Sequence, residues 1–348
     1  LNFGNLYIIK NLFPIRKRKE NNMNIITTDR LTKYYGKARG IIDLDLSVDQ
    51  GEFFGFIGPN GAGKSTTIRL LLGLIRPTSG SGKLFGMDIT NHSRKILSDI
   101  GYIPSEAMFY HKMTVAETLR FSAGLRKKDC KDQTRILCER LQLDPKKKTE
   151  DLSLGNRRKV SIICALQHDP KLCIFDEPTS GLDPLIQKEF FDILKERVRD
   201  GATVFLSSHV LSEIQQYCSR AAIIREGRII ACGDMAELAK TNAKRISLRG
   251  IKHEKLLSVL PPQLAAGIRD MQDTADTVSF LYQGNIKEVA NWLPQIDYTD
   301  LTITEPDLNE VFMHYYECPA GKDAASPIER PNHAPCIGKA AAERRKRS

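Results

Sequence analysis

The chain has 348 residues, a hydrophobic fraction of 41% and a formal net charge of +10. This length allows one large domain or two modest ones, and the apolar content is sufficient for buried cores. No stretch approaches the roughly 18 consecutive apolar residues of a membrane-spanning helix, which argues against an integral membrane protein.

The positive charge is concentrated at the two ends of the chain. Residues 1–22 hold five basic residues against one acidic residue, and residues 318–348 hold seven against three. The body between them carries only +2, which gives no basis for a nucleic-acid-binding face. We expect 1–22 to be a non-native or disordered extension ahead of Met23. The tail at 318–348, rich in Pro, Ala and charge, is expected to be disordered.

A glycine-rich loop is the first strong signal along the chain. Residues 25–57 predict short strands separated by turns. The apolar run at 53–57 then breaks into the loop 58–63, which opens onto a helix that Pro77 ends. The order of strand, loop and helix is typical of a phosphate-binding site.

The loop and the first helical residues spell G-x-x-x-x-G-K-S, from Gly58 to Ser65. Glycines let backbone N–H groups curl around an anion, and the helix N-terminus adds partial positive charge. Lys64 can reach the terminal phosphates, and the Ser65 hydroxyl can ligate Mg²⁺. The flanking strand and helix disfavour a chance glycine turn, so we expect the chain to bind a nucleoside triphosphate. The predicted phosphate-binding residues are Gly58, Pro59, Asn60, Gly61, Ala62, Gly63, Lys64, Ser65 and Thr66.

Strand-like and helix-like segments alternate after the loop. Strands are expected within 77–89 and at 100–103, 172–175 and 203–208. Helices are expected within 114–144 and at 156–168, 185–199 and 211–217. This alternation predicts a mainly parallel sheet with both faces covered.

The strand LCIFDE at 172–177 ends in two acids. Asp176 can hold Mg²⁺ through its coordination shell, and Glu177 can polarise an attacking water. Acids at strand ends are also common helix caps, so the pair alone is weak evidence. Following a phosphate loop in a parallel-sheet pattern, it becomes a strong indication of nucleotide hydrolysis.

Residues 28–233 resemble the nucleotide-binding subunit of an ATP-binding-cassette (ABC) transporter. LSLGN at 152–156 stands in place of the family signature L-S-G-G-Q, SGLD at 180–183 matches the D-loop, and His209 matches the switch histidine. The resemblance implies an α/β P-loop NTPase fold of the ABC ATPase type. Such a fold has a RecA-like parallel-sheet core, a small antiparallel β subdomain and a helical subdomain.

The resemblance also implies roles for individual residues. Tyr35 stands where an aromatic ring stacks on adenine, although the neighbouring Tyr34 leaves a one-residue ambiguity. In the family, each ATP lies between one phosphate loop and the signature of a second subunit. Ser153 and the N–H of Gly155 would form that second anion site, and Asp183 would link the two sites. Taken alone, Ser153 and Asp183 would be ordinary helix caps.

His209 is expected to sense the γ-phosphate, although in isolation it would be read as a histidine ending a strand. Two departures from the family pattern stand out. Ser105 replaces a glutamine that helps to hold Mg²⁺ and faces the membrane subunit, and it is too short to reach the metal without a bridging water. Leu154 and Asn156 replace a glycine and a glutamine of the signature. We expect hydrolysis, at a rate that these departures leave open, or alternatively one weaker site in an asymmetric pair.

We expect three parts between the ends: an ABC ATPase domain at 23–240, its helical subdomain at about 104–168, and a C-terminal α+β appendage at 241–317. Strands near 245–249, 277–282 and 298–303 and helices near 252–260, 286–293 and 307–316 are expected in the appendage. Its end, EPDLNEVFMHYYE at 305–317, is similar to the ends of ATPases that serve drug, bacteriocin or bacitracin-type exporters.

The implied function is ATP hydrolysis that drives export through a separately encoded permease at the cytoplasmic face of the membrane. The expected partners are a second ATPase subunit, identical or different, and the permease, with no nucleic acid. An ABC ATPase acting on ribosomes or DNA is disfavoured, because there is one cassette and no long coiled coil. A regulatory subunit that binds ATP without hydrolysing it stays open.

Overall fold

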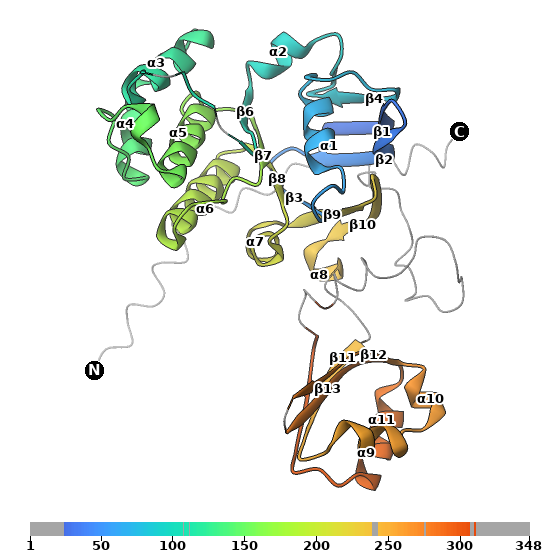
Figure 1. The fold of residues 1–348 in the computed structure, drawn as a ribbon. Coiled ribbons are helices and arrows are strands. Elements are labelled where there is room, and N and C mark those ends of the chain that lie inside the picture. Colours follow the sequence, from blue (N-terminus) through green and yellow to red (C-terminus); the bar gives the residue numbers. More distant parts are fainter. Residues whose placement is uncertain are drawn as a thin grey trace, which may run out of the picture.

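Three β-sheets organise the part of the chain that the structure describes. This computed structural model describes residues 24–106, 108–110, 112–238, 243–274, 276–306 and 310. The expectations for residues 1–22 and 318–348 lie outside these residues, as does nearly all of the helix expected at 307–316. Figure 1 shows the sheets and the helices around them.

The central sheet has six strands. In spatial order these are β10 (Arg228–Asp234), β9 (Arg220–Arg225), β3 (Phe53–Ile57), β8 (Thr203–Ser208), β7 (Leu172–Asp176) and β6 (Ile100–Ile103). Neighbouring strands are parallel except β10 and β9, which form an antiparallel pair. The short helix α8 (Met235–Leu238) follows β10. The predicted parallel sheet is confirmed.

Both faces of this sheet are buried. Successive residues of a strand point to opposite faces, and all residues of β3, β7 and β8 are buried. Phe54, Phe56 and Phe205 belong to the hydrophobic cluster on one face, where helix α1 (Lys64–Leu71) packs. Phe175 and Leu206 belong to the cluster on the other face.

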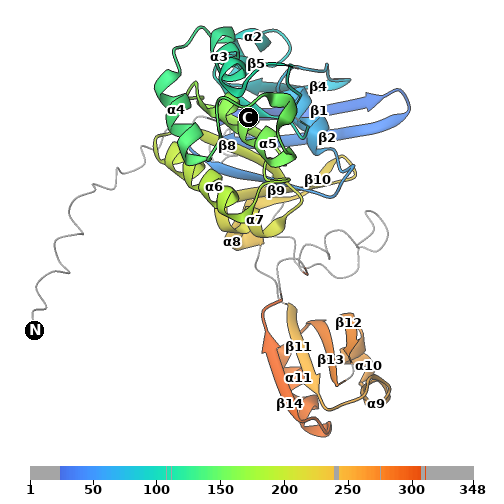
Figure 2. The ribbon, with the colours of Figure 1, turned by 60° about the vertical axis from the view of Figure 1, so that its left-hand side comes forward.

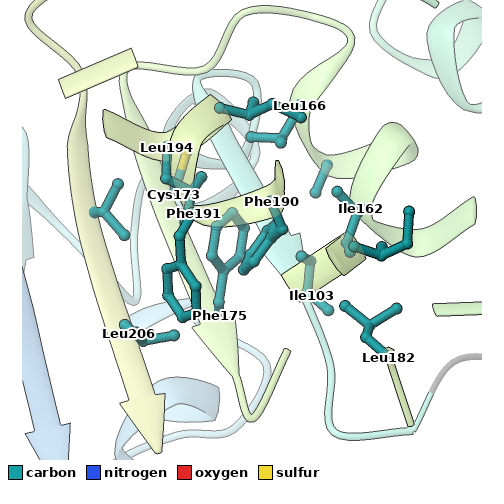
Figure 3. Packing of buried hydrophobic residues seen from close by; sticks show 14 of the residues in the cluster. Ile103, Ile162, Leu166, Cys173, Phe175, Leu182, Phe190, Phe191, Leu194 and Leu206 are labelled. Carbon is teal, nitrogen blue, oxygen red and sulfur yellow. The ribbon is translucent and has the colours of Figure 1, made fainter. Parts of the chain in front are cut away.

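The second cluster packs the sheet against helices that include α5 (Leu154–Leu166), α6 (Pro184–Arg199) and α7 (Leu211–Tyr217). Figure 3 shows Phe190 and Phe191 of α6 beside Phe175 of β7, and the ring centroids of Phe175 and Phe190 lie 5.7 Å apart. The helical coverage expected on both faces is therefore present.

A smaller antiparallel sheet lies beside α1 (Figure 1). Its strands are, in order, β2 (Ala38–Asp49), β1 (Asn24–Tyr35), β4 (Ser79–Leu84) and β5 (Met87–Asp88). The long β1 and β2 form a hairpin whose apolar residues join the cluster around α1. The helix α2 (Ser93–Leu97) leads from this sheet to β6.

A helical segment joins β6 to β7, and Figure 2 shows its helices, coloured green, close together. It consists of α3 (Val115–Leu125), α4 (Lys131–Arg140), the 3-10 turn η2 (Thr149–Asp151) and α5. Thr114 and Glu117 form a capping box that fixes the start of α3. Among the described residues, none of the helices has both the length and the apolar character needed to cross a membrane.

The C-terminal part forms a third sheet with its own hydrophobic cluster. The elements in chain order are β11 (Ala243–Arg249), α9 (His253–Ser258), α10 (Pro262–Ala265), β12 (Ile268–Thr274), β13 (Thr277–Gln283), α11 (Ile286–Trp292), η3 (Leu293–Gln295) and β14 (Asp300–Thr304). The strands pair antiparallel in the order β12-β13-β11-β14. The strand β12 was not predicted, because its sequence IRDMQDT is mostly polar and half or fully exposed.

Candidate nucleotide-binding and hydrolysis site

The predicted phosphate loop connects β3 to α1, and its backbone requires glycine. Gly61 and Gly63 have φ of 78° and 114°, in the left-handed region that favours glycine. A Cβ atom on Gly63 would lie 2.8 Å from a side-chain carbon of Ile41. The loop therefore keeps its curled shape only with these glycines. Such a loop presents backbone N–H groups toward its concave side.

Helix α1 begins at Lys64, and Gly63 precedes it as the N-cap without a capping side chain. Ser65 and Thr66 lie in the first turn and are half-buried. The Thr67 hydroxyl donates to the Gly63 carbonyl at 3.0 Å, which ties the helix to the loop. The positive end of α1 thus points at the concave side of the loop, as an anion site requires.

Lys64 is buried, with only 5% of its surface exposed. Its Nζ donates to the Gly58 carbonyl at 2.6 Å and to the Pro59 carbonyl at 3.2 Å. The same Nζ lies 3.2 Å from Oε1 of Glu177. The ammonium group is therefore held between the loop and a carboxylate from β7's end, in a buried setting where an unpaired charge would be costly.

Glu177 also contacts His209. Its Oε2 lies 3.2 Å from Nδ1 of His209, which follows β8. The backbone N–H of Glu177 donates to the Ser207 carbonyl at 3.1 Å, and Glu177 has a φ of 50°. A non-glycine residue in this region is uncommon and strained. The parallel pairing of β8 with both β7 and β3 therefore brings Glu177, His209 and Lys64 together at one edge of the sheet.

Asp176, the last residue of β7, is buried beside Ser207 of β8. The Ser207 hydroxyl donates to Oδ1 of Asp176 at 2.6 Å. Because these residues pair in the parallel register, the contact follows directly from the sheet. It holds a buried carboxylate in place next to the Lys64–Glu177 pair.

Ser105 follows β6, whose Ile103 pairs with Phe175 of β7. The strand pairing therefore places the segment at 104–105 beside the strand that carries Asp176. The Ser105 side chain is exposed, and its carbonyl accepts a hydrogen bond from Arg158 of α5 at 2.7 Å. A role for Ser105 at the metal stays a prediction.

Tyr35 ends β1, and its ring lies near α1. A Cβ atom on Gly40 would meet both the Tyr35 ring and the Thr66 methyl group at 3.2 Å, so these two side chains flank the same point. Tyr34 points to the opposite face of the strand. This geometry favours Tyr35 over Tyr34 as the adenine-stacking residue, which stays a prediction.

The signature residues contact the D-loop segment at 180–183. Ser153 caps α5, because its Oγ accepts from the Asn156 N–H at 3.3 Å. A Cβ atom on Gly155 would lie 2.6 Å from the Gly181 carbonyl, and Asp183 caps α6 by accepting from the Ile186 N–H at 3.0 Å. The capping roles are therefore realised in this chain. Roles for Ser153, Gly155 and Asp183 toward nucleotide remain predictions.

Two residues of the site, Ser207 and Arg158, were not identified from the sequence. Ser207 is a polar residue inside the otherwise apolar strand TVFLSS. Arg158 lies four residues before Ile162, on the buried face of α5, where a charged residue needs partners. A polar residue on an apolar face was the signal in both cases.

Comparisons with known proteins agree with this geometry. A family model described as ABC transporter matches residues 41–180. The bacitracin transport ATP-binding protein BcrA of Bacillus licheniformis is 36% identical over 300 residues, covering 83% of this chain and 96% of the relative. The linearmycin resistance ATP-binding protein LnrL of Bacillus subtilis (strain 168) is 29% identical, covering 83% and 97%.

A solved structure of an ATP-binding subunit of an ABC transporter is also similar. It aligns with a TM-score of 0.59 and 30% identity, covering 62% of this chain and 91% of that chain. The predicted fold and family are thereby confirmed. The chain belongs to the ATP-binding proteins of ABC transporters, and it is an ATPase subunit that binds nucleotide for transport.

Proposed function

We propose that the chain binds ATP with Mg²⁺, hydrolyses it within a dimer and thereby drives export through a separately encoded permease. The observation that carries this proposal is the cluster of Lys64, Glu177 and His209, which joins the phosphate loop to two strand ends. An ammonium, a carboxylate and an imidazole in contact are the groups that phosphate binding and water activation need.

In this proposal Lys64 exchanges Glu177 for the terminal phosphates when ATP binds. The freed Glu177 carboxylate then accepts hydrogen bonds from the attacking water, and His209 contacts the γ-phosphate while it orients Glu177. Phosphate oxygens would accept from the N–H groups of the loop and the first turn of α1. Lys64 and Glu177 would thus both change their partners when ATP binds.

The donor groups near the loop suit Mg²⁺. The Ser65 hydroxyl and the buried Asp176 carboxylate supply oxygen only, which hard cations prefer. Asp176 would hold the ion through water, with its carboxylate fixed by Ser207. Bound Mg²⁺ would neutralise negative charge on the phosphates. A contact from Ser105 would need a bridging water.

The dimer is supported by where the second anion site lies. Leu154 and Gly155, which follow Ser153, lie against Gly181 of the segment at 180–183, whereas Lys64 contacts the loop and Glu177. A second subunit facing the loop would bring its own Ser153 to the phosphates. Leu154 and Leu185 are 69% and 77% exposed beside this segment, which supports apolar contacts with such a subunit.

A permease contact is supported by exposed apolar side chains after β6. Met108, Tyr110, Phe121 and Leu125 are exposed, and the Tyr110 and Phe121 rings meet edge to face at 5.6 Å. Large apolar side chains gathered on a surface are typical of an interaction site. Docking here would hold the chain at the inner face of the membrane. The names of BcrA and LnrL support an antibiotic-like transported molecule.

The test is the ATPase rate of the purified full chain over a range of protein concentrations. A rate that rises more steeply than linearly supports a self-sufficient dimer. Lys64→Ala should remove the activity, whereas Lys83→Ala, on the exposed side of β4, should leave it unchanged. Saturable ATP binding without turnover at every concentration would contradict hydrolysis by this chain alone.

A second candidate is the weakly hydrolysing half of a heterodimer. Leu154 at the signature and Ser105 after β6 favour it, because both replace residues that the family uses at the site. Turnover that appears only after a different ATPase subunit is added would support this candidate over the homodimer.

A further inference from the structure

The guanidinium group of Arg158 joins two segments of the proposed hydrolysis site. Arg158 belongs to α5, the helix that Ser153 caps, and only 5% of its surface is exposed. Its Nη1 donates to the Pro104 carbonyl at 2.6 Å, and its Nη2 donates to the Ser105 carbonyl at 2.7 Å. One side chain therefore holds two successive carbonyls of the segment that follows β6.

This segment lies next to the two acids of the site. Ile103 pairs with Phe175 in the parallel sheet, so Pro104 and Ser105 extend beside Asp176 and Glu177. Burial lowers the pKa of the Arg158 guanidinium, whereas the charges of Asp176 and Glu177 raise it. The guanidinium thus lies within the electrostatic field of both carboxylates. A buried cation here balances part of their negative charge.

The hydrogen bond from Arg158 to the Ser105 carbonyl matters because the side chain at position 105 is short. The Ser105 side chain is short and exposed, and the contact that this position makes with α5 comes from its main-chain carbonyl. A guanidinium has a fixed planar fork that matches two acceptors at once, which a lysine ammonium cannot do. The fork therefore determines where the main chain at 104–105 lies relative to Asp176 and Glu177.

We propose that Arg158 is a positioning residue for hydrolysis, which ties the segment at 104–105 to α5 and holds it beside Asp176 and Glu177. This inference rests on the proposed ATPase function of the same site. Arg158 acts through the main chain of Pro104 and Ser105, and touches neither the nucleotide nor the water. It also connects this segment to α5, the helix that Ser153 caps.

The test compares three variants of the full chain. Arg158→Met removes the charge and both hydrogen bonds, Arg158→Lys keeps the charge but loses the fork, and Arg135→Gln is the matched control. Arg135 is an exposed arginine of α4, and its Nη1 donates to Oε1 of Glu139 at 3.1 Å. Turnover, ATP affinity and the midpoint of thermal unfolding are measured for each.

We expect Arg158→Met to lower kcat by about tenfold or more, with ATP affinity changed less than about threefold. Arg158→Lys should recover folding but only part of kcat, and Arg135→Gln should match the wild type. The inference is overturned if Arg158→Met keeps kcat within about twofold of the wild type. It is also overturned if kcat, ATP affinity and unfolding midpoint fall together in both Arg158 variants, because a purely structural role predicts that result.

Hydrogen exchange of peptides covering residues 100–106 gives a readout that does not depend on turnover. Exchange there should be faster in both Arg158 variants than in Arg135→Gln, because the main chain at 104–105 has lost the guanidinium group that holds it. If the wild type shows no hydrolysis, the proposed function fails, and exchange alone decides the positioning. Unchanged exchange in a folded Arg158→Lys variant would contradict the inference.

Discussion

The Nζ atom of Lys64 lies 3.2 Å from Oε1 of Glu177, so the predicted phosphate-binding cation and the predicted water-activating carboxylate are paired with each other. The phosphate-loop lysine cannot bind a γ-phosphate and keep this partner unchanged. Since Glu177 also contacts His209 at 3.2 Å, binding of phosphate would rearrange the whole cluster. Glu177 thereby joins Lys64 and His209 through its two carboxylate oxygens.

Glu177→Gln should bind ATP more tightly than the wild type while losing turnover. The neutral amide no longer competes for Lys64 and no longer repels the phosphates. An amide is a poor base, however, and the loss of general-base catalysis lowers the rate by about 10²–10⁴-fold. Equilibrium binding of a fluorescent ATP analogue and single-turnover hydrolysis measure the two effects. Glu226→Gln is the matched control, because Glu226 has a φ of 49° and is exposed. Turnover within a few-fold of the wild type would show that Glu177 does not activate the water.

Ser207→Ala should raise the Mg²⁺ concentration needed for half-maximal ATPase activity. It removes the 2.6 Å hydrogen bond that fixes Asp176, so the carboxylate gains freedom. The loss of one buried hydrogen bond also lowers the free energy of unfolding by about 1 kcal/mol. An Mg²⁺ titration at saturating ATP checks the first effect. An unchanged Mg²⁺ requirement, together with the loss of stability, would limit Ser207 to a structural role.

His168 should make the protein less stable as the pH falls. Burial, with Arg126 and Lys128 nearby, lowers the pKa of His168 from 6.5 to about 4, and its Nε2 lies 3.1 Å from the Ile100 carbonyl. The unfolded chain therefore binds a proton at a higher pH than the folded chain does. The stability that neutral His168 provides is fully present above pH 6.5 and is lost as the pH falls from 6.5 toward 4.

Urea unfolding at about pH 7.5 and about pH 5 tests this dependence. In His168→Gln, whose side chain does not titrate, the midpoint should fall less between the two pH values than in the wild type. An equal fall in both proteins would show that other groups cause the pH dependence.

Phe190→Ala should destabilise the ATPase core by about 3–5 kcal/mol, because it leaves a cavity in the cluster between β7 and α6. Phe190 is fully buried, and its ring lies 5.4 Å from that of Phe191. Leu185→Ala on the same helix is the control, since Leu185 is exposed and its loss should cost less than about 0.5 kcal/mol. Chemical unfolding of both variants gives the comparison. A similar midpoint for the two would contradict the assigned core.

The sequence by itself determined the phosphate loop, the parallel sheet and the acids at the end of β7. Each depends on local chemistry, namely glycines that allow positive φ, strand periodicity and the order of strand, loop and helix. These signals lie within short stretches, so no distant contact was needed to read them. The strand β12 was missed for the opposite reason, because its polar sequence is a strand only through pairing with β13.

Only the tertiary structure decided which side chains meet. The contacts of Lys64 with Glu177, of Ser207 with Asp176 and of Arg158 with Pro104 and Ser105 join residues 31 to 113 positions apart. Such contacts depend on strand order and register in the sheet, which local patterns do not specify. The sequence therefore identified the groups needed for hydrolysis, whereas the packing of the parallel strands set how those groups are paired.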